Sequence, residues 1–129
     1  MLENLNLKNT KIALIGSSNN PEKYGNKILL NLLSKGHQVF PISKKEEYIA
    51  NQKCFSEIKN LNFIPDIINF VIPPSIGFEL TINLVNEGYD NFWYQPGAES
   101  KEISDFLRLN NKNYIDDKCI MVESKNLNN

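Results

Sequence analysis

A polar loop near the amino terminus carries the residue types that proteins use to hold phosphate groups. It follows a short apolar run, Ile12 to Ile15, and precedes a stretch with apolar residues at helical spacing. Backbone N–H groups at the start of a helix lack partners inside it, and the helix dipole is positive there. The pattern therefore predicts a binding site for a phosphate group. The candidate binding residues of the loop are Gly16, Ser17, Ser18, Pro21, Lys23, Tyr24 and Gly25.

This loop differs from the common dinucleotide-binding fingerprint. The pattern G-x-G-x-x-G requires glycine at two positions where Ser18 and Pro21 stand. The hydroxyl groups of Ser17 and Ser18 suit a pyrophosphate, and Lys23 adds a positive charge. The alternative is a serine-asparagine-proline turn that binds nothing.

A second candidate segment follows the apolar run that ends at Ile42. An NAD site favours Asp or Glu at this point, to hold the ribose hydroxyls. Here the chain reads Ser43, Lys44 and Lys45, with no acid until Glu46. The lysines favour a phosphorylated ribose, as found in NADP and in coenzyme A. The alternative is a solvated, charged start of a helix.

Two further candidate segments follow the later apolar runs. Pro73 and Pro74 form a stiff pair without backbone N–H groups, which either lines a ligand or only ends a strand. Gln95 offers both a donor and an acceptor. Gly97 lets the backbone approach a ligand closely.

These segments require a scaffold that brings them together. Strands are expected at 11–16, 37–42, 66–72, 90–95 and 113–115, and helices at 24–35, 75–86 (with Ser75 as N-cap) and 99–109. Residues 43–53 read as a loop with a short helix, 54–56 as a brief strand or turn, and 124–129 as a frayed end. The alternation predicts an α/β fold, a three-layer open parallel sheet of about five strands with helices on both faces. With the strand order 3-2-1-4-5, loops 16–25, 43–45, 73–75 and 95–98 meet in one crevice.

Composition limits the classes of function. The 129 residues suit a single domain, with a core of about 9–123, and the net charge of -1 argues against binding to nucleic acid. No apolar run approaches the roughly 20 residues of a membrane span. The first residues lack the pattern of a signal peptide, so a cytoplasmic location is expected. Cys54 and Cys119 form no metal-binding motif, and reduced thiols are expected.

No catalytic constellation is recognisable, so no catalytic or metal-binding residue is predicted. The only histidine, His37, stands at the start of the second strand, away from the expected crevice. Without it, neither a Ser/His/Asp nor a Cys/His arrangement can be assembled. Asp116 and Asp117 are adjacent, and neighbouring residues of a strand point to opposite faces.

The ordered segments GSSNNPEKYG, VFPIS, FVIPP and WYQPGAES, with a late Cys119, resemble the small CoA-binding domain family. The same domain forms the N-terminal part of the α subunit of succinyl-CoA synthetase. The resemblance covers about residues 9–123 and implies a Rossmann-like fold with the ADP part of CoA in the crevice. It implies that Gly16, Ser17, Ser18, Lys23, Tyr24 and Gly25 face the pyrophosphate. The other binding positions are Pro21, Ile42, Ser43, Lys44, Ile72, Pro73, Pro74, Gln95 and Gly97.

The resemblance implies a non-catalytic role: binding of CoA or an acyl-CoA through its ADP moiety, as a carrier, a sensor or the partner of an enzyme. The phosphohistidine domain of succinyl-CoA synthetase is absent from the 129 residues. The expected partner is a small nucleotide ligand, with a homodimer or a partner enzyme as further options. Cys119 is either a small buried side chain or a thiol that meets the CoA thiol. The alternatives are an NADP-linked oxidoreductase and an interaction module without a ligand.

Overall fold

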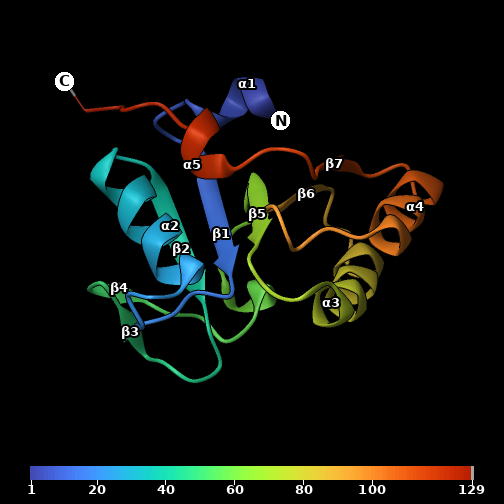
Figure 1. Ribbon diagram of the computed structural model, residues 1–129, viewed down its shortest axis with the longest axis horizontal. Coiled ribbons are helices and arrows are strands. Elements are labelled where there is room, and N and C mark those ends of the chain that lie inside the picture. The colour runs from blue at the N-terminus through green and yellow to red at the C-terminus, as the bar shows by residue number, and fades with distance from the viewer. Residues whose placement is uncertain (129) are drawn as a thin grey trace.

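A computed structural model of the chain describes residues 1–128 and contains one central parallel sheet (Figure 1). The strands of this sheet are β1 (Lys11–Ile15), β2 (Gln38–Ile42), β5 (Ile67–Phe70), β6 (Asn91–Tyr94) and β7 (Asn113–Ile115). The longer helices are α2 (Tyr24–Ser34), α3 (Pro74–Asn86) and α4 (Lys101–Leu109). The shorter elements are α1 (Leu2–Leu5), β3 (Tyr48–Ile49), β4 (Gln52–Lys53), η1 (Ile58–Asn60) and α5 (Ile120–Glu123).

The order of strands across the sheet is β2-β1-β5-β6-β7, and every neighbouring pair is parallel. The expected order 3-2-1-4-5 is therefore wrong, because the third long strand, β5, pairs with β1 and not with β2. Beyond β2, Phe55 makes one parallel bridge to Ile42, and residues 54–56 form no strand. The chain leaves β1 toward β2 and later crosses back to β5. The strand order thus reverses between β1 and β5, where open parallel sheets bind ligands.

The carboxyl ends of the strands are level with one another. Ile15 at the end of β1 pairs with Ile42 of β2 and with Phe70 of β5. Phe70 in turn pairs with Tyr94 of β6. The loops that follow these strands therefore start from the same edge of the sheet.

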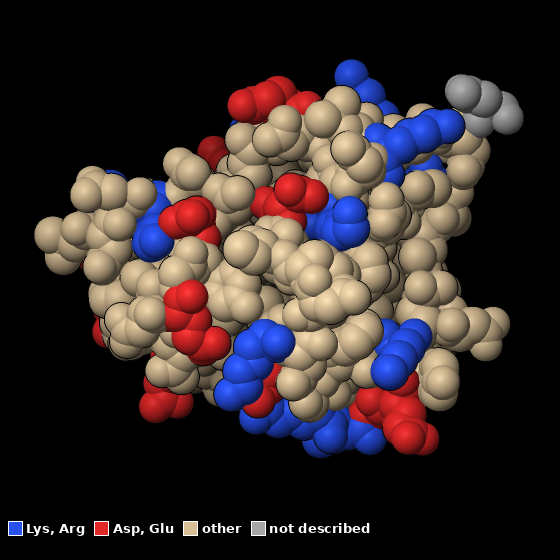
Figure 2. All heavy atoms as spheres, turned by 180° about the vertical axis from the view of Figure 1, so that it is seen from behind, with Lys and Arg blue, Asp and Glu red and all other residues tan. Residues whose placement is uncertain are grey.

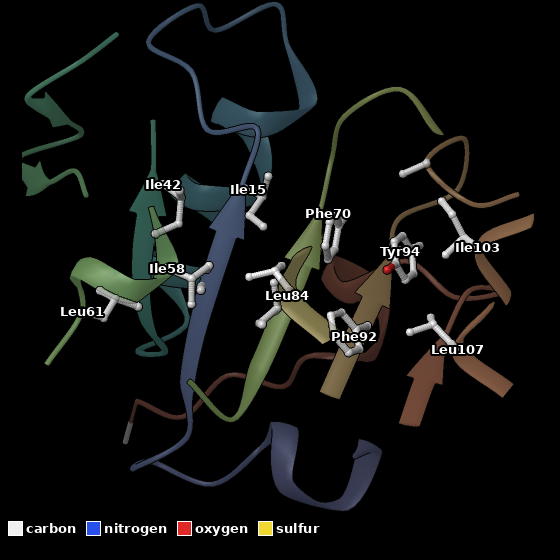
Figure 3. Packing of buried hydrophobic residues seen from close by; sticks show 13 residues of the cluster. Ile15, Ile42, Ile58, Leu61, Phe70, Leu84, Phe92, Tyr94, Ile103 and Leu107 are labelled. Carbon is white, nitrogen blue, oxygen red and sulfur yellow. The ribbon is translucent and has the colours of Figure 1, made fainter. Parts of the chain in front are cut away.

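Two hydrophobic clusters, one on each face of the sheet, confirm the expected three layers. On one face, the sheet packs against η1, α3 and α4, with Ile58, Leu84 and Leu107 among the buried residues (Figure 3). On the other face, α1, α2 and α5 cover the sheet, with Leu29 and Ile120 fully buried. Strands buried on both faces explain why β5 reads as an almost continuous apolar run.

Glycines end two of the helices as expected, but the start of α3 differs. After α2, Gly36 adopts a φ of 87°, and His37 N–H bonds to the carbonyl of Leu32. This is the hydrogen-bond pattern of a Schellman cap.

Ser75 is not the N-cap of α3, because the helix already begins at Pro74 with Pro73 before it. A proline is well placed there, since the first helical N–H has no partner inside the helix.

A small hairpin replaces the loop and short helix expected over residues 43–53. Its strands β3 and β4 are antiparallel, and Ala50 and Asn51 between them both have positive φ, 51° and 62°. Two consecutive left-handed residues favour a two-residue hairpin turn. Ile49 is fully buried and anchors the hairpin against the face of α2.

The carboxyl-terminal segment is tied to the domain through residue 128, so the expected fraying of 124–128 is wrong. Leu127 N–H donates to the carbonyl of Lys35, and His37 Nε2 lies 2.8 Å from the carbonyl of Lys125. As expected, His37 is buried directly before β2, at the end of the sheet where the strands begin and away from their carboxyl ends. Residue 129 lies outside the described residues.

The surface matches the balanced charge of the sequence. Figure 2 shows basic and acidic side chains scattered over one face that is mostly uncharged. Within residues 1–128, no helix is both long and apolar enough to cross a membrane.

Candidate functional site

The turn between β1 and α2 is packed so closely that two of its positions require glycine. Gly16 has a φ of 98°, and a Cβ there would lie 2.8 Å from the carbonyl oxygen of Val71. A Cβ on Gly25 would lie 1.9 Å from the carbonyl oxygen of Gly16. The first turn of α2 therefore lies directly against the end of β1. Asn26 holds the turn further, because its Nδ2 donates to the carbonyl of Ser18 at 3.0 Å.

The same turn presents backbone donors that the rest of the described chain leaves unused. The N–H groups of Ser17, Ser18, Tyr24 and Gly25 have no acceptor among residues 1–128. Tyr24 and Gly25 open α2, an 11-residue helix without a side-chain cap at its start. Unpaired N–H groups and the positive end of a helix dipole together form a site for an anion.

The two serines of the turn differ in their availability to a ligand. Ser17 Oγ donates to the carbonyl of Leu14 at 2.8 Å, so its proton is engaged within the protein. Ser18 Oγ accepts from the backbone N–H of Asn20 at 3.0 Å and keeps its own proton free. The backbone of both residues, and the hydroxyl of Ser18 alone, can therefore donate to a ligand.

A cavity of about 1290 Å³ extends from this turn across the ends of β2, β5 and β6. That volume exceeds the roughly 300–1,000 Å³ of most small-molecule sites and suits a long ligand. All the binding residues predicted from the sequence line it except Pro21, which is exposed outside the cavity. The lining residues outside that prediction are Asn19, Glu22, Ile28, Lys45, Glu46, Val71, Ile76, Pro96, Ala98 and Cys119.

Several of these additional residues carry no distinctive signal in the sequence. Ile28 has the helical spacing of a core residue, and Val71 continues the apolar run of β5. Their type predicts burial but not contact with a ligand. By contrast, Asn19, Lys45 and Pro96 are chain neighbours of predicted residues, so wider loop boundaries would have included them.

The charged residues of the cavity favour an anionic ligand. Three lysines, Lys23, Lys44 and Lys45, and two carboxylates, Glu22 and Glu46, line the cavity, so positive charge is in excess. The turn after β2 is held by Ser43, whose Oγ accepts from the backbone N–H groups of Lys45 and Glu46 at 3.2 and 3.3 Å. All three lysines are exposed, so each contributes a solvent-screened attraction of modest size.

Another part of the cavity wall is apolar. It consists of side chains at the end of β5 and the start of α3, together with Ile28 and Ile42. Ile76 is 56% exposed and Tyr24 is 64% exposed at the opening. Exposed apolar side chains beside a cavity favour a ligand with an uncharged portion. The residues from β5 and α3 are Val71, Ile72, Pro73, Pro74 and Ile76.

A buried polar network lies where β6 meets the segment before α5. Gln95 is only 5% exposed, and its Oε1 accepts from Asn69 Nδ2 at 3.2 Å and from Ile120 N–H at 2.9 Å. Its Nε2 donates to Cys119 Sγ at 3.2 Å. Because the backbone N–H of Ile120 must face an acceptor, the orientation of the Gln95 amide is fixed.

The cavity contains none of the usual arrangements for nucleophilic or metal-assisted catalysis. His37 lies at the opposite edge of the sheet, and Asp116 and Asp117 are not among the lining residues. Within the described residues, no group of three His, Cys, Asp or Glu side chains could hold a metal ion. The arrangement can bind an elongated anion with an apolar portion.

The model of a protein family described as a CoA binding domain matches residues 10–125. The chain belongs to this CoA-binding domain family. The match spans the sheet and every loop of the cavity. The Rossmann-like fold and the family predicted from the sequence are thus confirmed.

Individual relatives include both small and large proteins. A conserved hypothetical protein of Pyrococcus furiosus is 45% identical, with a TM-score of 0.84, over 88% of this chain and 98% of that one. The α subunit of an ADP-forming acetate–CoA ligase II of Pyrococcus furiosus is 23% identical over 128 residues, 91% of this chain. This chain spans only 28% of that subunit.

A solved acetyl-coenzyme A synthetase shares the fold. The dinucleotide-forming enzyme of Candidatus Korarchaeum cryptofilum is 23% identical, with a TM-score of 0.68 over 85% of this chain and 25% of that one. At this identity the similarity concerns the fold alone. The fold therefore occurs both in a small protein and as part of a larger chain.

Proposed function

We propose that this CoA-binding domain binds coenzyme A or an acyl-CoA through its ADP moiety, without performing chemistry on the acyl group. The observation that carries the proposal is the set of unpaired N–H groups of Ser17, Ser18, Tyr24 and Gly25, which lies in the wall of the large cavity. A pyrophosphate supplies the acceptors that these donors lack.

The remaining cavity residues match the other parts of such a ligand. Lys44 and Lys45 suit the 3′-phosphate of the adenosine, and the apolar wall around Ile72 and Pro73 suits the pantetheine arm. The volume of about 1290 Å³ accommodates a ligand longer than a mononucleotide. Membership in the CoA-binding domain family supports the same ligand.

The biological role consistent with binding alone is that of a carrier, a sensor or the partner of an enzyme. As expected from the sequence, we place it in the cytoplasm, either as a homodimer or with a partner enzyme. Self-association through β6 is disfavoured, because this strand lies inside the sheet with Phe92, Trp93 and Tyr94 fully buried.

Thermal melting with a panel of nucleotides tests the proposal. A ligand at about 100 times its dissociation constant adds roughly 2.7 kcal/mol of stability, which is on the order of ten degrees for a domain of this size. We expect this shift with CoA and acetyl-CoA, a smaller one with dephospho-CoA and ADP, and none with NAD or NADP. A shift with NADP alone would instead select an oxidoreductase, and no shift with any of them would select an interaction module.

A further inference from the structure

Cys119 lies in the wall of the same cavity, next to Gln95. Its side chain is half-buried, and its Sγ accepts the hydrogen bond from Gln95 Nε2. A donor directed at the sulfur restricts the orientation of the Cys119 side chain. The thiol is therefore both reachable from the cavity and held in one place.

A second observation at this point calls for a ligand. Gln95 Nε2 carries two N–H bonds, and only the one directed at Cys119 has an acceptor within residues 1–128. Gln95 is only 5% exposed and lines the cavity, so a molecule bound in the cavity can supply an acceptor for its second N–H. An unused donor on a buried side chain is costly unless a ligand acceptor satisfies it.

The chemistry of the two neighbouring groups specifies the ligand that would use both. It must present a carbonyl acceptor a few bonds away from a sulfur atom. The pantetheine arm of CoA meets this requirement, because its last amide lies two methylene groups from the terminal thiol. Gln95 would bind the amide carbonyl while the sulfur lies near Cys119.

We propose that Cys119 is a modification site that forms a mixed disulfide with CoA, by exchange with the disulfide of CoA. This inference rests on the proposed function, since the nucleotide must bind first. The Cys119 thiolate attacks one sulfur of the CoA disulfide, and a new sulfur–sulfur bond forms as the old one breaks. The second CoA leaves as a thiolate and takes a proton from water, so the number of disulfides is unchanged.

Cys54 provides a matched control within the same chain. It is buried, and burial, followed by the nearby charge of Glu46, raises the pKa of its thiol. A raised pKa leaves less thiolate to react. Cys54 is also absent from the lining of the cavity, so a ligand-directed reaction should leave it unmodified.

Intact-mass spectrometry after incubation with CoA disulfide tests the site. We expect one adduct per chain, with the mass of one CoA less two hydrogen atoms, removed by dithiothreitol. Peptide mapping of the wild-type protein should locate it on Cys119, which keeps the test valid if a variant fails to fold. Cys54→Ala should form the adduct as the wild type does, and Cys119→Ser should not.

Two comparisons decide whether the cavity directs this reaction. The adduct should form ~10-fold faster or more with CoA disulfide than with hydroxyethyl disulfide, which lacks the nucleotide, because binding raises the local concentration. Equal rates, or equal modification of Cys54, would overturn the inference. Melting with CoA under reducing conditions is measured separately. A shift without an adduct refutes the Cys119 site alone, whereas no shift refutes the proposed function and this inference with it.

Discussion

Gly25 is the residue on which the geometry of the turn between β1 and α2 depends most directly. The carbonyl of Gly16 occupies the space that any Cβ at position 25 would need, at 1.9 Å. Because that carbonyl belongs to the backbone at the end of β1, it cannot move without displacing the turn. The absence of a side chain at Gly25 thus keeps the first N–H groups of α2 close to those of Ser17 and Ser18.

The substitution Gly25→Ala should therefore reduce both stability and ligand binding. We expect overpacking to cost about 1–3 kcal/mol of unfolding free energy, measured by chemical denaturation. The stabilisation by CoA should be lost as the turn shifts. Gly77→Ala is the control, because a Cβ there meets only ordinary contacts at 3.8 Å or more, and alanine is favoured over glycine in a helix. Equal effects of the two substitutions would contradict this role of Gly25.

At the scale of elements, α5 is too short to be stable by itself and is held in place by α2. The helix spans only Ile120–Glu123. Lys35, the C-cap of α2, donates from its Nζ to the carbonyl of Met121 at 2.7 Å and to the carbonyl and hydroxyl of Ser124 at 3.2 and 3.0 Å. This contact fixes the segment whose first residues bind Gln95.

Lys35→Met should loosen that segment while leaving the sheet intact. Hydrogen bonds to a charged group contribute about 1.5–3 kcal/mol, so we expect a loss of about 2 kcal/mol and faster proteolysis within residues 119–128. Lys125→Met is the matched control, since Lys125 is exposed and its side chain makes no hydrogen bond or ion pair within residues 1–128. A Lys35 variant as stable and as resistant as the control would show that α5 is held by apolar contacts alone.

At the scale of the whole molecule, the two ends of the parallel strands, here called the two edges of the sheet, have different roles. The strand ends at Ile15, Ile42, Phe70 and Tyr94 are level, and their loops surround the cavity. The opposite edge carries His37 and is closed by the carboxyl-terminal segment through its bond to Lys125. We therefore expect CoA to bind where the strands end, whereas the segments at their other end complete the fold.

Amide hydrogen exchange should reveal this division. The N–H groups of Ser17, Ser18, Tyr24 and Gly25 lack acceptors in the described chain and should exchange rapidly without ligand. With CoA bound, they should become protected, because they then donate to phosphate oxygens. Amides at the opposite edge, such as that of Leu127, should change little. Protection that is spread evenly over both edges would contradict binding in the cavity.

The sequence predicted most of the residues that line the cavity on the β1–α2 side and at the strand ends, because their signals are local. Glycines, prolines and lysines that follow apolar runs mark the ends of buried strands, and these positions line the cavity. Pro21 is the exception, since its neighbours in the turn face the cavity while it points to solvent. The hairpin at Ala50 and Asn51 was missed, because its turn depends on two left-handed residues that their types do not require.

The sequence by itself determined the alternation of strands and helices, the glycine-dependent turn after β1 and the family, since each rests on residues close together in the chain. Only the tertiary structure decided that β5 pairs with β1, that the tail is tied to Lys35 and His37, and that Cys119 lies beside Gln95. These contacts join residues far apart in sequence. They are selected by how the apolar faces pack and by which buried polar groups find partners, and no local pattern encodes that choice.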